Sequence, residues 1–86
     1  MTYLVTGGAG FIGSRVVRDL VRDGEKVVIY DWFPETANLE RVLNTGEIEA
    51  NVKIVQGDVT DYSHLLRTIN DNKIVKIIHM AAMMLL

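Results

Sequence analysis

Short apolar runs and amphipathic stretches alternate along the first third of the chain. Residues 2–6 (TYLVT) and 26–31 (KVVIYD) are rich in β-branched and aromatic residues, which predicts two buried strands. Between these strands, apolar residues recur at helical spacing opposite a charged face, which predicts an amphipathic helix that Gly24 closes. The apolar residues are Ile12, Val16, Val17, Leu20 and Val21. The predicted unit is strand, glycine-rich turn, helix, strand.

The same alternation continues to residue 82. Helix formers dominate residues 35–43, with Leu39, Val42 and Leu43 as a weaker stripe, and "NTG" at 44–46 predicts the end of that helix. Residues 52–56 predict a third strand and residues 73–82 (KIVKIIHMAA) a fourth. Between these strands, Thr60 or Asp61 is the expected N-cap of a helix, whose apolar stripe is Tyr62, Leu65, Leu66 and Ile69.

Strands that alternate with helices predict an α/β fold. Right-handed crossovers then give a parallel sheet with helices on both faces. We find no linker, repeat or low-complexity segment in residues 1–86, which we interpret as one domain.

Composition narrows the class of partner. The 86 residues carry a net charge of −2, and basic residues are scattered among acidic ones, which argues against a nucleic-acid interface. No apolar run is long enough to span a bilayer, and with no cysteine and no ligand spacing around His64 and His79 we expect no metal site. A small-molecule partner and a cytoplasmic location are the expectation.

Glycines crowd the turn after the first predicted strand, in "TGGAGFIG". Gly8, Gly10 and Gly13 satisfy G-x-G-x-x-G, a pattern in which the backbone admits a pyrophosphate at a helix N-terminus. The alternative is an ordinary tight turn between strand and helix. A phosphate-binding loop of the Walker type is disfavoured, because no Lys-Ser or Lys-Thr follows the glycines.

Asp31 ends the second predicted strand, 18 positions beyond Gly13. At that place a carboxylate can accept hydrogen bonds from the adenosine ribose hydroxyls and repel a 2′-phosphate. No Arg or Lys follows it directly, so NAD is favoured over NADP. The alternative is a turn-forming aspartate before "WFP".

Four segments together, "TGGAGFIGS", "YD", "GDVTD" and "IIHMAA", resemble the N-terminal half of extended short-chain dehydrogenase/reductases, the NAD-dependent epimerase/dehydratase group. The resemblance implies a Rossmann-type sheet with strand order 3-2-1-4. It also implies the cofactor-binding residues Gly7, Gly10, Phe11, Ile12, Gly13, Asp31, Asp58, Val59, Ala81 and Ala82.

The resemblance assigns a part of the cofactor to most of these residues. The backbone of Phe11 and Ile12 would contact the pyrophosphate, and Asp58 and Val59 would flank the adenine, with the Asp58 side chain accepting from its exocyclic amine. Ala81 and Ala82 would lie along the phosphates and the nicotinamide ribose. For Asp58, the alternative is a turn or helix-capping role.

Other side chains near these motifs have ordinary explanations. We interpret His79 as a packed, hydrogen-bonded strand residue, His64 as a solvated helix residue and Met80 as core-facing. Trp32 and Phe33 stand where relatives usually place a smaller polar residue, and could pack beside the adenine or cover the sheet.

The family's catalytic Tyr-x-x-x-Lys pair is absent, since Tyr3, Tyr30 and Tyr62 are not followed by Lys four positions on. We expect no catalytic residue here and interpret the chain as the NAD-binding portion of an oxidoreductase or isomerase that transfers hydride at a carbon of a nucleotide sugar. The alternatives are a non-catalytic nucleotide-binding or regulatory module and a structural βα unit with a vestigial loop. The fourth strand, at the edge of the implied sheet, predicts self-association.

Overall fold

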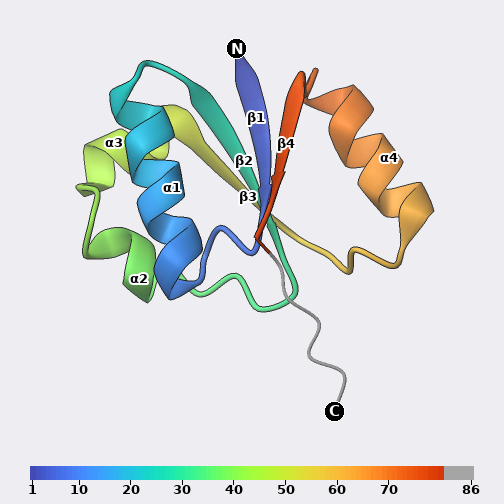
Figure 1. Ribbon diagram of the computed structural model, residues 1–86, viewed down its shortest axis with the longest axis horizontal. Helices are drawn as coiled ribbons and strands as arrows, with labels where there is room; N and C mark the ends of the chain where they lie inside the picture. Colours follow the sequence, from blue (N-terminus) through green and yellow to red (C-terminus); the bar gives the residue numbers. More distant parts are fainter. Residues whose placement is uncertain (81–86) are drawn as a thin grey trace.

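The computed structural model describes residues 1–80, which form four strands and four helices (Figure 1). In chain order the elements are β1 (Thr2–Thr6), α1 (Phe11–Arg22), β2 (Lys26–Asp31), α2 (Ala37–Glu40), α3 (Thr45–Asn51), β3 (Val52–Gln56), α4 (Tyr62–Asp71) and β4 (Lys76–His79). The predicted alternation of strands and helices is confirmed.

The four strands form one parallel sheet in the order β3-β2-β1-β4. This is the predicted order 3-2-1-4. Thr6 at the end of β1 pairs with Tyr30 on one side and His79 on the other, and Asp31 pairs with Gln56. The carboxyl ends of all four strands therefore meet at one edge of the sheet.

Helices cover both faces, but unequally. The helices α1, α2 and α3 lie on one side of the sheet and α4 on the other (Figure 1). Neighbouring strand residues alternate between the two cores, as a pleated strand requires: Val5 and Ile29 join the larger core, whereas Leu4, Val28 and Tyr30 form the smaller one.

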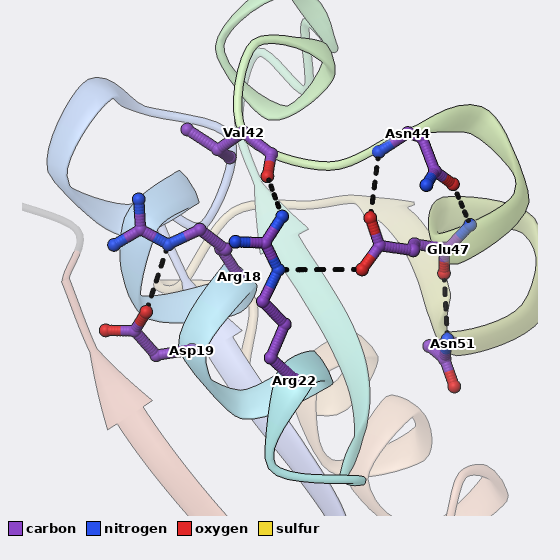
Figure 2. A network of polar contacts seen from close by, with 7 residues as sticks. All are labelled: Arg18, Asp19, Arg22, Val42, Asn44, Glu47 and Asn51. Atoms are coloured by element: carbon purple, nitrogen blue, oxygen red, sulfur yellow. Dashed lines mark hydrogen bonds and ion pairs between the residues drawn. The ribbon is translucent and has the colours of Figure 1, made fainter.

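The predicted single helix over 35–43 is wrong. The segment forms only the short α2, and Asn44 begins a second helix, α3, instead of ending the first. The reason is a capping box: the Asn44 side chain accepts from Glu47 N at 2.8 Å, and the Glu47 carboxylate accepts from Asn44 N at 3.1 Å. Arg22 links this cap to α1 by donating to the Val42 carbonyl and pairing with Glu47 (Figure 2).

The two longer helices are partly as predicted. Gly24, with φ of +88°, closes α1, and Asp61 caps α4 by accepting from His64 N. Ile12 is 65% exposed, however, because the buried face of α1 begins with Gly13 and Ser14, which lie against the glycine-rich turn.

In α4 and β4 the predictions also need correction. Leu65 and Ile69 pack on the smaller core, while Tyr62 and Leu66 are exposed. The strand β4 covers residues 76–79 of the predicted 73–82, because residues 72–74 still complete the turn after α4, with Lys73 at φ of +52°. Its C-terminal neighbours Ala81 and Ala82 lie outside the described residues.

Candidate functional site

A pocket of about 730 Å³ opens at the edge where the strands end. Parallel α/β sheets bind ligands at this edge, where the strand order reverses between the first and fourth strands. The residues that line it come from the ends of all four strands and the loops that follow: Gly7, Gly10, Tyr30, Asp31, Trp32, Gly57, Asp58, Val59, Thr60, His79 and Met80.

Close backbone packing explains two of the glycines in the turn between β1 and α1. Gly7 has φ of +70°, a conformation that favours glycine. A Cβ on Gly13 would stand 2.2 Å from the Gly7 carbonyl oxygen, too close for any side chain. The interpretation as a tight turn therefore accounts for Gly7 and Gly13 without a ligand.

Gly10 is different, because a Cβ there would make fewer and longer contacts within the turn. A Cβ there would meet only the Gly7 carbonyl oxygen, at 3.3 Å, yet Gly10 lines the pocket and is the N-cap of α1. It offers no capping side chain, and the first turn of α1 contains no acidic residue. The amides of the first turn, from Phe11 to Gly13, thus suit an anion at the positive end of the helix dipole.

Asp31 has the turn-forming role considered for it and a second contact, to the glycine-rich turn. Its Oδ1 accepts from Phe33 N at 3.2 Å, which is the turn-forming role, and its Oδ2 accepts from Ala9 N at 3.3 Å. The half-buried carboxylate therefore joins the end of β2 to the glycine-rich turn and faces the pocket. It places a negative charge beside the anion-binding end of α1.

Asp58 shapes the loop that follows β3. Its Oδ1 accepts from both the amide and the hydroxyl of Thr60, at 2.8 and 2.7 Å, and these hydrogen bonds hold the pKa of the Asp58 carboxyl below its usual value. Its carbonyl accepts from Asp61 N. Val59 both lines the pocket and packs against the smaller core. The predicted site residues Asp58 and Val59 are thus brought to the same pocket as Asp31.

Three residues that the sequence did not indicate shape the part of the pocket formed by Asp58 and Val59. They are Tyr30, Gly57 and His64. Tyr30 is fully buried, and its hydroxyl lies 3.0 Å from His64 Nδ1 and 3.2 Å from the Asp58 carbonyl oxygen. The prediction of a solvated His64 is wrong. These contacts join residues 28 and 34 positions apart, so no local sequence pattern indicates them.

The predictions for other residues near the pocket are confirmed only in part. His79 is exposed rather than packed, but its Nδ1 does form a hydrogen bond with Thr6 Oγ1 at 2.7 Å. Met80 packs against the larger core. Trp32 and Phe33 are 56% and 71% exposed, so they do not cover the sheet, and their rings meet edge to face.

Comparison with known proteins gives a family. The family model described as GDP-mannose 4,6 dehydratase matches residues 4–86. The chain belongs to this family. The UDP-glucose 4-epimerase of Haemophilus influenzae is 39% identical to it over 85 residues, covering 96% of this chain and 25% of that protein. The corresponding enzyme of Lactobacillus helveticus is 36% identical and covers 95% of this chain and 23% of that protein.

Solved structures of the family have the same fold. UDP-glucose 4-epimerase from Stenotrophomonas maltophila, with bound NAD and formylated UDP-arabinopyranose, matches with a TM-score of 0.82 and 33% identity, over 99% of this chain and 25% of that one. The dTDP-glucose 4,6-dehydratase of Bacillus anthracis, in complex with NAD, matches with a TM-score of 0.79 and 30% identity, over 96% and 27%. The chain thus spans about a quarter of the length of these relatives, and its Rossmann-type fold is that of NAD-dependent epimerases and dehydratases.

None of the helices within residues 1–80 is long and apolar enough to cross a membrane. The same residues contain no group of three or more His, Cys, Asp or Glu side chains placed to hold a metal ion.

Proposed function

We propose that this chain is the NAD-binding portion of an epimerase or dehydratase that acts on nucleotide sugars. One observation carries the proposal: the fold brings the N-terminus of α1 and the Asp31 carboxylate, from two different strand ends, to the same pocket. Relatives of the same fold bind NAD. The pocket volume of about 730 Å³ is ordinary for a small-molecule site, roughly 300–1,000 Å³.

The residues at the pocket suit different parts of such a ligand. The first turn of α1 has no capping side chain, and its N-cap, Gly10, lines the pocket, so this turn suits the pyrophosphate. Asp31 suits the adenosine ribose, and its charge opposes a 2′-phosphate. Val59 and Asp58 then border the adenine, while Ala81 and Ala82, outside the described residues, are proposed contacts from the resemblance alone.

The bound NAD would supply a hydride acceptor, and the residues of this chain would bind and orient it. The proposed reaction is hydride transfer at a sugar carbon of a nucleotide sugar. Proton transfer would need a Tyr-x-x-x-Lys pair, which these 86 residues do not contain. We propose a cytoplasmic location, where NAD and nucleotide sugars are available.

Calorimetric titration with NAD and NADP tests this function. We expect NAD to bind more tightly, and Asp31→Asn to narrow the preference over NADP by about tenfold, or 1.4 kcal/mol, because the charge that opposes the 2′-phosphate is lost. Asp23→Asn, at the C-cap of α1, is the matched control and should leave the preference unchanged. Tighter binding of NADP than of NAD by the unmodified chain would refute the role given to Asp31.

We also propose that the 86-residue polypeptide self-associates through β4. This strand lies at an edge of the sheet, and Val75 and Ile77 beside and within it are 58% and 52% exposed. An edge strand with exposed apolar side chains can pair with a second copy. Sedimentation at micromolar concentration should show a dimer or larger species, which Ile77→Lys should reduce to monomer; a monomeric unmodified chain would contradict the proposal.

A further inference from the structure

The hydroxyl of Tyr30 occupies a junction behind the pocket wall. Tyr30 comes from β2 and is fully buried, His64 comes from α4, and Asp58 belongs to the loop after β3. The Tyr30 oxygen lies 3.0 Å from His64 Nδ1 and 3.2 Å from the Asp58 carbonyl oxygen. One side chain thus connects a strand, a helix and a loop that the sequence places far apart.

Gly57 fits closely over the ring of Tyr30. A Cβ on Gly57 would lie 2.2 Å from Tyr30 Cζ and 2.4 Å from its hydroxyl oxygen, so only glycine lets the loop follow this path. The Gly57 amide donates to the Asp31 carbonyl at 3.0 Å. The start of the loop is therefore held between the tyrosine ring and the end of β2.

The protons at this junction allow one arrangement that satisfies every contact. The Tyr30 hydroxyl carries a single proton, and the Asp58 carbonyl can only accept. Both short contacts are hydrogen bonds only if the hydroxyl donates to Asp58 and His64 carries a proton on Nδ1, from which it donates to the Tyr30 oxygen. Burial raises the pKa of Tyr30, and the Asp61 and Asp58 carboxylates raise it further, so the hydroxyl keeps its proton.

We propose that Tyr30 and His64 are positioning residues: they fix the loop of residues 57–61 so that Asp58 and Val59 present a preformed wall to the adenine half of the ligand. This inference rests on the proposed function for the identity of the ligand. Tyr30 contributes to the pocket lining but is fully buried, whereas His64 is not part of the lining and acts through Tyr30.

Hydrogen exchange of the loop tests the positioning without any ligand. The amides of Thr60 and Asp61 donate to the Asp58 side chain and carbonyl. We expect Tyr30→Phe and His64→Leu each to speed their exchange about five- to tenfold, while amides of the β1–β2 ladder keep their rates. His64→Asn, whose amide nitrogen can replace Nδ1 as a donor, should restore slow exchange. Tyr3→Phe is the matched control.

Binding of the two halves of the cofactor tests the link to the site. We expect Tyr30→Phe and His64→Leu to raise the Kd for AMP about fivefold and to leave the Kd for nicotinamide mononucleotide unchanged. Unchanged loop exchange in both variants would overturn the inference, whatever the ligand does. Faster loop exchange with an unchanged AMP Kd would overturn the link to the site.

The failure of the proposed function has a separate signature. If the unmodified chain binds neither NAD nor AMP, the proposed function fails, and the exchange data still decide whether Tyr30 and His64 fix the loop. Nitrogen-15 spectra of His64 give an independent readout and should show a proton on Nδ1. A proton on Nε2 alone would mean that Tyr30 donates to His64 instead of Asp58, and would overturn the proposed anchor.

Discussion

Two loops line the same pocket, and they are built in different ways. The turn of residues 7–13 owes its shape to its own backbone: Gly7 at positive φ, and Gly13 against the Gly7 carbonyl. The loop of residues 57–61 owes its shape to a distant side chain, since Tyr30 lies beneath both Gly57 and the Asp58 carbonyl.

The two loops should therefore respond differently to substitution. Local backbone packing makes the first loop part of the junction between β1 and α1, so a substitution that disturbs it disturbs the fold. The second loop is attached through one hydrogen bond from the Tyr30 hydroxyl to the Asp58 carbonyl and through its own Asp58–Thr60 contacts, and His64 of α4 in turn holds the Tyr30 hydroxyl. It can be loosened while the sheet beneath it stays intact.

The largest effect is expected from Gly13→Ala. Its Cβ would stand 2.2 Å from the Gly7 carbonyl oxygen, and backbone on both sides must shift. We expect a loss of about 3 kcal/mol in the free energy of unfolding, as for severe overpacking, measured by urea denaturation. Gly10→Ala is the matched comparison, because its Cβ would meet the same Gly7 oxygen at 3.3 Å, and it should cost clearly less. Equal stability of the two variants would show that the turn is not held by this contact.

A smaller loss of stability is expected from Gly57→Ala. The new Cβ would meet the buried Tyr30 ring, but the loop can move outward into solvent, so we expect a loss of about 1–2 kcal/mol in the free energy of unfolding. Gly46→Ala, inside α3 with its nearest atom at 3.4 Å, should be neutral or slightly stabilising. In a Tyr30→Leu background, Gly57→Ala should lower the free energy of unfolding by clearly less than it does in the unmodified chain. An unchanged cost there would contradict the contact with Tyr30.

The smallest effect is expected from Asp58→Asn, and it is measurable only in the pH dependence of the melting temperature. The native pKa of Asp58 is lowered from 3.8, so its stabilising contribution is present above that pH and is lost as pH falls through the lower native value. Melting temperature should therefore fall less steeply in acid for Asp58→Asn than for the unmodified chain. Thermal melts between about pH 5 and pH 2 measure it, and parallel acid limbs would contradict the role of the carboxylate.

Most of the sheet could be predicted because its signals are local. The β-branched runs at residues 2–6, 26–31 and 52–56 became β1, β2 and β3 with the predicted bounds, and Asp61 caps α4. The helix prediction for the segment after Asp31 was wrong because Asn44 can either follow a helix or begin one. Its hydrogen bonds with Glu47 stabilise the second role.

The candidate site divides in the same way. Gly10 and Asp31 were indicated by motif spacing and Asp58 by the family resemblance, and all three line the pocket, at or shortly after the ends of predicted strands. Tyr30 and His64 could not be identified in this way, because neither a strand tyrosine nor a helical histidine has a local sequence feature that predicts their hydrogen bond. That bond exists only once β2 and α4 face each other in the folded chain.

The position of β4 beside β1 has a consequence for the folding pathway. The contact between Thr6 and His79 spans 73 residues, whereas β1 and β2 join through one helix. Long loops close at a greater entropic cost, so we expect β1 and β4 to pair after β1 and β2 do. His79 and Met80 complete the pocket only at that step. A partly folded chain therefore lacks one wall of the site, so a ligand binds the fully folded state and stabilises it by RT ln(1 + [L]/Kd).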